Sequence, residues 1–142
     1  MTAKEFLRQA YRLDVRIGSD MMELEELREL STGIGSPGFE QSYNPNRPKE
    51  APFAKALERV HDMEERISAE IESLTLKKEE IRSVIDEVED FDQQMLLRYR
   101  YLHRCSWDEI CEKMHYSTRW LHILHGKGLS AVDAVLRRRG LQ

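Results

Sequence analysis

The sequence is poor in cysteine and in long apolar runs, and each absence narrows what the protein can be. Its 142 residues include two cysteines, Cys105 and Cys111, whose spacing matches no redox or zinc pattern. No apolar run approaches the roughly 18 residues that span a membrane. The N-terminal residues lack the apolar core and small-residue cleavage site of a signal peptide. We therefore expect a cytoplasmic protein with reduced thiols and no membrane contact.

Sequence motifs of catalysis are missing as well. The chain has no phosphate-binding loop, no Gly-x-Ser-x-Gly elbow and no metalloprotease motif. Glutamate-rich stretches at residues 23–26 and 77–80 are typical of solvated helix flanks, not of paired catalytic carboxylates. An elongated helical chain also offers no obvious deep pocket. We expect neither enzymatic activity nor a cofactor.

Proline and glycine are concentrated in one segment. Residues 32–52 contain all four prolines and three of the seven glycines, which predicts a linker or loop. The chain as a whole is 40% hydrophobic and 34% charged, a composition that favours amphipathic helices. The sequence thus predicts an all-α protein.

Two helical stripes flank the linker. The first runs from about residue 3 to residue 30 with a period near 3.5; its apolar positions are Phe6, Ala10, Leu13, Ile17, Met21, Leu24 and Leu27. The second runs from about residue 53 to residue 89 with a heptad pattern; its two series are Leu57, Ile71 and Ile85, and Val60, Ile67, Leu74, Ile81 and Val88. The simplest arrangement is a long antiparallel hairpin, coiled-coil-like, over residues 1–90. It either brings copies together as a homodimer or higher homo-oligomer, or closes within a monomer.

Charge separates the two parts of the chain. Residues 1–91 carry 13 Lys and Arg against 21 Asp and Glu, a net charge of −8, whereas residues 92–142 carry 9 against 5, a net charge of +4. A basic C-terminal part beside an acidic N-terminal part places the polyanion-binding surface at residues 91–142.

Residues 106–132 are typical of two short helices joined by a tight turn. Asp90 first opens a helix with acidic residues at its start, as the helix dipole favours. Ser106 and Glu109 then fit a capping box, and Ser117 offers a second N-cap. Two capped helices this close together indicate a helix-turn-helix over residues 91–142.

The second helix of this pair leaves polar residues on its outer side. Thr118 and Arg119 lie on its first turn, where a recognition helix reaches base edges, and His122 lies one turn further on. Arg119 can bind guanine with its forked guanidinium. Lys127, with Arg98 and Arg100 as further candidates, suits phosphate anchoring. The predicted partner is double-stranded DNA.

The same residues resemble region 4 of bacterial sigma factors, which reads the promoter −35 element. The matching segments are residues 96–101, 106–114, 116–117 and 125–129. This resemblance adds Ile123, and in part Trp120, to the DNA-reading positions. It also places His115 at a turn position that usually holds glycine. The whole layout resembles small phage and prophage proteins of Gram-positive bacteria, of the ArpU and RinA kind. The resemblance implies a transcriptional regulator of phage genes in the bacterial host cell, with RNA polymerase as a further candidate partner.

Several alternatives stay open at this point. His103, Cys105, Cys111 and His115 could form a tetrahedral zinc site, although their spacing belongs to no common zinc module. The run 137–139 of three arginines could bind phosphate or complement a helix C-terminus. Trp120 could stack on bases or close a small core, whereas Trp107 is expected in the core. The whole chain could instead be a DNA-packaging protein like a small terminase subunit, or a sigma-like module that binds RNA polymerase alone.

Overall fold

The structure is a computed structural model that describes residues 1–32 and 50–142, except for the side chains of residues 50–53. All its regular elements are helices, and the described residues contain no β-strand, which confirms the predicted all-α class. Of the predicted linker, only residue 32, at the end of one helix, and residues 50–52, at the start of the next, are described. No described helix is both long enough and apolar enough to cross a membrane.

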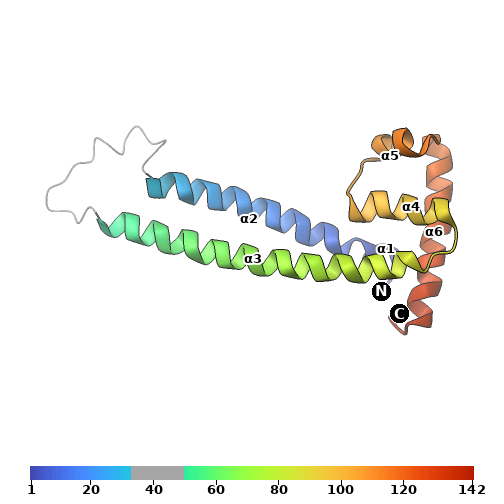
Figure 1. The fold of residues 1–142 in the computed structure, drawn as a ribbon, viewed down its shortest axis with the longest axis horizontal. Coiled ribbons are helices and arrows are strands. Elements are labelled where there is room, and N and C mark those ends of the chain that lie inside the picture. The colour runs from blue at the N-terminus through green and yellow to red at the C-terminus, as the bar shows by residue number, and fades with distance from the viewer. Residues whose placement is uncertain (33–49) are drawn as a thin grey trace. The chain divides into compact units, whose positions relative to one another are not determined.

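Seven elements follow one another along the chain (Figure 1). They are α1 (Ala3–Leu7), α2 (Gln9–Thr32), α3 (Glu50–Asp86), α4 (Phe91–Leu97), the π-helix η1 (Arg98–Leu102), α5 (Trp107–Met114) and α6 (Thr118–Arg138). The chain forms two compact units: a first unit of residues 1–14 and 73–142, and a second unit of residues 15–72. Neither boundary falls at residue 90, and the predicted division into a hairpin domain and a DNA-binding domain stays a prediction.

The second unit holds parts of α2 and α3 side by side, with a mixed seam. Ile17, Leu24 and Ile67 are buried, as their stripes predict. The expected Met21 is instead 54% exposed, and Asp20 is only 7% exposed. Asp20 is buried in place of Met21 because of its position on α2. Residues 17, 20 and 24 are three and then four positions apart, so they share one face of the helix. The Asp20 carboxylate lies 3.6 Å from the Arg66 guanidinium, which offsets the cost of its burial.

In both heptad series of α3, burial depends on the position along the chain. The series that contains Ile67, Ile81 and Val88 is buried at these three positions. In the other series, Leu57 and Ile71 are exposed, whereas Ile85 is fully buried. Apolar side chains on this part of α3 therefore remain at the surface of the second unit.

The first unit contains two clusters of buried apolar residues. The larger joins the N-terminal residues to the end of α3 and to α6; among its members are Phe6, Leu7, Ile81, Ile85, Leu97, Val132, Val135 and Leu136. The smaller lies between α4, α5 and α6; its buried members are Leu96, Cys105, Ile110, Leu121 and Leu124. Together they hold α5 and the first half of α6 against α4.

The helix ends of this unit follow the sequence closely. The Ser106 hydroxyl accepts the Glu109 N–H at 3.1 Å, and the Glu109 carboxylate accepts the Ser106 N–H at 3.4 Å, which confirms the capping box. The Ser117 hydroxyl accepts the Trp120 N–H at 3.2 Å, as an N-cap does. Asp90 caps α4 in the same way.

Gly128 of α6 lies against Leu97 of α4. A glycine inside a helix costs about 1 kcal/mol relative to alanine. A Cβ added at residue 128 would lie 3.4 Å from two side-chain carbons of Leu97, which is itself fully buried. An alanine side chain at this position would therefore make ordinary van der Waals contact with Leu97, so the packing does not require glycine.

The turn between α5 and α6 stores backbone strain at His115. This residue has φ 58° and ψ 39°, the left-handed conformation in which the sequence resemblance expects glycine. We expect His115→Gly to raise the free energy of unfolding by about 1 kcal/mol, since glycine has no Cβ to clash in this conformation. Urea unfolding followed by circular dichroism measures the change.

His115→Ala is the matched control for this substitution, because alanine removes the imidazole but keeps the Cβ. It should leave the stability close to that of the original protein or below it. An equal gain from alanine and glycine would mean that the imidazole, and not the backbone, causes the strain.

Candidate nucleic-acid interface

The first two turns of α6 separate an inner face from an outer one. Leu121 and Leu124 point into the smaller core cluster, where they join Ile110 of α5. The six positions predicted to contact DNA are all exposed: Thr118, Arg119, Trp120, His122, Ile123 and Lys127. The same turns that anchor α6 to α5 thus present these side chains to solvent.

An aromatic and cationic group lies along this outer face. Trp120 is 40% exposed, so it does not close a core. Its ring meets the Tyr116 ring edge-on, with centroids 6.4 Å apart, and the Lys127 ammonium lies 5.6 Å from the Trp120 centroid. The Tyr116 hydroxyl donates to Asp92 at 2.8 Å, and this hydrogen bond raises the pKa of the tyrosine. Cation and rings together form a surface on which a base or a phosphate can lie.

Thr118 and Arg119 differ in how they are held. The Thr118 hydroxyl lies 3.4 Å from the Cys111 sulfur, a contact that restrains its rotation. Arg119 forms no ion pair with any carboxylate of the described residues, so its guanidinium is available to a ligand. An unpaired forked cation on the first turn of a helix suits bidentate binding to a base edge or a phosphate.

His122 belongs to a second aromatic group on the opposite edge of α6. Its ring lies 4.4 Å from the Trp107 ring, centroid to centroid, and the His125 ring lies 5.1 Å from the same indole. Trp107 is only partly buried and packs against the smaller core cluster. It therefore both supports the core and shapes the surface beside His122.

His125 is held in its neutral form. Its Nε2 lies 2.7 Å from the Tyr101 hydroxyl, and the two rings stack. Partial burial, with the positive charges of Lys4 and Arg100 nearby, lowers the pKa of His125 to about 4.

This lowered pKa predicts acid sensitivity. The unfolded ring, with a pKa of 6.5, binds a proton more readily than the folded ring. Neutral His125 thus contributes stability that is complete above pH 6.5 and is lost as pH falls through 4. We expect a loss on the order of 1–2 kcal/mol, since water screens this partly exposed ring. Urea unfolding of the original protein and of His125→Gln at several pH values measures it.

The His125→Gln variant should lose less stability on acidification than the original protein, because it lacks the titrating ring. His103→Gln serves as the control, since it removes an exposed histidine outside this group. Equal acid losses in the original protein and the His125 variant would contradict the assignment.

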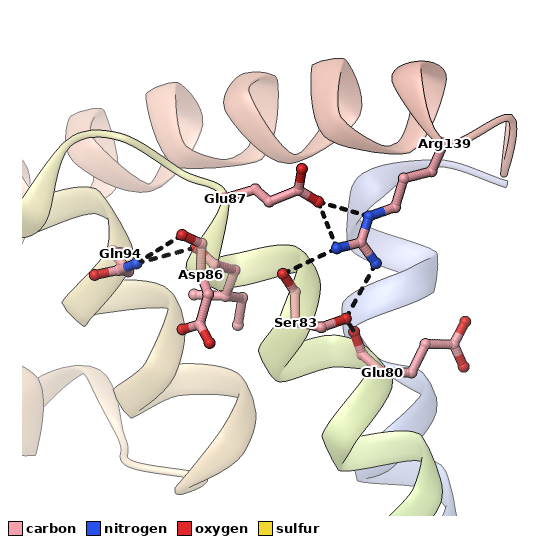
Figure 2. Close-up of polar contacts among 7 residues, drawn as sticks. Glu80, Ser83, Asp86, Glu87, Gln94 and Arg139 are labelled. Atoms are coloured by element: carbon pink, nitrogen blue, oxygen red, sulfur yellow. Dashed lines mark hydrogen bonds and ion pairs between the residues drawn. The ribbon is translucent and has the colours of Figure 1, made fainter.

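Two other arginines that were candidates for phosphate contacts already bind groups of the protein itself. The Arg98 guanidinium donates to Asp86 at 3.2 Å. Arg139 binds Glu87 and donates to the Ser83 hydroxyl and carbonyl at 3.0 and 3.1 Å, as Figure 2 shows. The latter contacts tie the end of α6 to α3, so this arginine serves the structure of the first unit.

The possible zinc ligands are not brought together. Among the described residues, which include all four candidates, no three His, Cys, Asp or Glu side chains lie where they could share a metal ion. Cys105 is buried in the smaller core cluster, and Cys111 contacts Thr118.

One part of the surface was not foreseen from the sequence. Lys4 and Arg8, from the N-terminal helices, line a pocket together with Arg100, Arg104 and His122. Lys4 and Arg8 are four positions apart, or about one helical turn. This spacing is the only feature of the local sequence that places them on one face. Nothing local in the sequence indicates that this face meets η1 and α6.

These features define an all-helical protein with a solvent-exposed basic and aromatic surface around α5 and α6. The chain belongs to the family described as "Protein of unknown function (DUF1492)", whose model matches residues 57–131. The match covers most of α3 and continues through α4, η1 and α5 into α6. Comparisons with curated proteins and with solved structures found no match.

Proposed function

We propose that the protein is a sequence-specific DNA-binding transcriptional regulator of phage or prophage genes. In this proposal α5 and α6 act as a helix-turn-helix like that of sigma-factor region 4, and α6 is the recognition helix. The observation that carries it is the exposure of Thr118, Arg119 and His122 on the first turns of α6, beside the buried Leu121. Recognition helices read base edges with residues at this end.

The turn and the charge support the same proposal. Three residues separate α5 from α6, and His115 reverses the chain in the left-handed conformation. The +4 charge of residues 92–142 attracts the phosphate backbone, whereas the −8 charge of residues 1–91 does not. Lys127 would anchor a phosphate next to the base-reading residues.

The long helices would set the oligomeric state. We propose that α2 and α3 form the antiparallel hairpin and that its exposed apolar residues meet a second copy. In the second unit, Met22 is 70% exposed and Leu57 is 58% exposed. A symmetric dimer would place two recognition helices on half-sites about one helical turn apart, or a multiple of that.

A DNA-packaging role like that of a small terminase subunit is the second candidate, favoured by the same exposed apolar residues. The two candidates differ in the number of copies. Sedimentation equilibrium gives the mass of the assembly: two copies favour the regulator, and a ring of eight or more favours packaging.

The DNA-binding proposal itself is tested by selection. The purified protein is incubated with sheared phage and host DNA, bound fragments are sequenced, and the enriched site is compared with random DNA in gel shifts at two salt concentrations. A shared motif that binds more tightly than random DNA supports the proposal. Binding without any preferred sequence, or no binding, overturns it; in the latter case binding to purified RNA polymerase is examined.

A further inference from the structure

The first unit has a concave pocket that the proposed DNA reading leaves largely unused. Its volume is about 440 Å³. The walls come from the N-terminal helices, from η1 and the residues after it, and from the starts of α5 and α6. Small-molecule sites typically measure roughly 300–1,000 Å³, so this pocket has the size of a ligand site.

Four cations and no carboxylate line the pocket. The cations are Lys4, Arg8, Arg100 and Arg104. Arg104 is paired with Asp14 at 2.7 Å. In the described part of the chain, Lys4 and Arg8 form no ion pair. An excess of positive charge therefore faces the pocket and favours an anionic ligand.

Two of these cations, Arg100 within η1 and Arg104 just after its end, are held in place by contacts within the protein. The Arg100 guanidinium lies 5.0 Å from the centroid of the Trp107 ring and donates to the Cys105 carbonyl at 3.1 Å. The Arg104 guanidinium lies 5.0 Å from the centroid of the Tyr11 ring. Arg104 also has φ 55°, a strained conformation for a residue with a Cβ, and such strain clusters at binding sites. Fixed cations lose little entropy when they bind phosphate oxygens.

Aromatic rings form the rest of the wall. Tyr101, Trp107, His122 and His125 all line the pocket, and the two imidazole rings contact the indole. His125 adds no charge near neutral pH, so it contributes a flat, polar face. Flat rings beside fixed cations match a ligand that has both a planar ring and phosphate groups.

We propose that this pocket binds a nucleotide, with its phosphates at Lys4, Arg8 and Arg100 and its base against the Trp107 and His122 rings. Duplex DNA fits the pocket less well, because the double helix is too wide to enter it. Only a phosphate group of the duplex could reach into the pocket. The nucleotide site shares His122 with the predicted DNA-reading residues and Arg100 with the candidate phosphate contacts. Lys4 and Arg8 belong to neither set, so their substitution separates the nucleotide site from the proposed DNA-binding function.

The two tryptophans allow the pocket to be observed separately. Trp107 lines it, whereas Trp120, the only other tryptophan, lies on the predicted DNA-reading face. In a Trp120→Phe protein, ATP should quench the Trp107 fluorescence in a saturable way, with N-acetyltryptophanamide as the control for light absorption. Calorimetry on the original protein should give a dissociation constant below ~1 mM for ATP.

Competing probes separate the two halves of the ligand. Tripolyphosphate carries the charge without the base, and adenosine carries the base without the charge. Each should bind at least about tenfold more weakly than ATP, which corresponds to about 1.4 kcal/mol. Equal affinity for ATP and tripolyphosphate would overturn the base contact and with it the nucleotide assignment.

Substitutions locate the site. The double variant Lys4→Gln, Arg8→Gln should weaken ATP binding about tenfold or more, because two charge-assisted phosphate contacts are lost. Arg82→Gln, an exposed α3 cation that does not line the pocket, is the matched control and should bind ATP as the original protein does. Arg100→Gln provides an independent test from η1, and thermal unfolding checks that each variant is folded.

The result that overturns the proposal is no saturable ATP binding up to ~1 mM, or equal ATP binding by the double variant and the Arg82 control. If the double variant weakened only DNA binding, the pocket would belong to a DNA interface, and the nucleotide assignment would again be wrong. The DNA selection experiment uses no nucleotide, so either function can fail without the other.

Discussion

Leu121→Ala should destabilise the protein by about 3 kcal/mol, within the range of 2–5 kcal/mol for leucine truncation in a core. Leu121 is fully buried in the smaller core cluster, where it packs with Ile110 and Leu124. Its truncation would leave a cavity in the cluster that attaches α6 to α5. Urea unfolding followed by circular dichroism measures the loss as a lower midpoint at an unchanged slope.

Ile123→Ala is the matched control, two residues further along the same helix. Ile123 is 45% exposed, so its truncation should change stability by less than about 1 kcal/mol. Ile123 is instead expected to matter for DNA, as the sigma-factor resemblance implies. Similar losses of stability in the two variants would mean that α6 does not bury Leu121 while exposing Ile123.

Arg119→Ala should weaken binding to the selected DNA site by about 1–3 kcal/mol, roughly a 5- to 150-fold loss, and relax its sequence preference. The expectation follows from the exposed, unpaired guanidinium on the first turn of α6. Fluorescence anisotropy with the selected site and with random DNA measures both quantities. Unchanged affinity for the selected site would reject Arg119 as a base-reading residue.

Two control substitutions separate charge from geometry. Arg119→Lys keeps the charge but not the fork, so it should retain binding to random DNA and still lose sequence preference. Lys127→Ala should instead weaken all sequences alike and reduce the salt slope of the logarithm of the binding constant by about 1. A sequence-dependent effect of Lys127→Ala would place this residue among the base contacts.

Local features of the fold could be predicted from the sequence because their causes are local. The caps at Asp90, Ser106 and Ser117 need only residues within three positions, and all three are in place. The position of the turn at His115 follows from the resemblance and its backbone angles agree. Periodicity alone was less reliable: it placed Met21 on the buried face, where the spacing of three and then four residues puts Asp20.

Distant contacts could not be predicted in this way. The sequence favours one helix over residues 3–30, but the structure divides it at Arg8, next to the pocket that Arg8 lines. It also gives no sign of the π-helix that carries Arg100 and Tyr101. The exposed side chains of α6 were identified because helix faces follow from sequence spacing. The pocket was missed because its walls meet only in the folded chain.

The larger core cluster joins the first residues of the chain to the last helix. The Ala3 N–H donates to Asp133 at 2.9 Å across a sequence separation of 130 residues, and Phe6 and Leu7 pack with Val135 and Leu136. During synthesis on the ribosome, the N-terminal residues can reach their α3 partners first, and their contacts with α6 form only after the intervening residues have been made. Such distant closure slows folding. A fragment that starts at residue 91 would expose the surface they cover, so expression of the C-terminal third by itself invites aggregation.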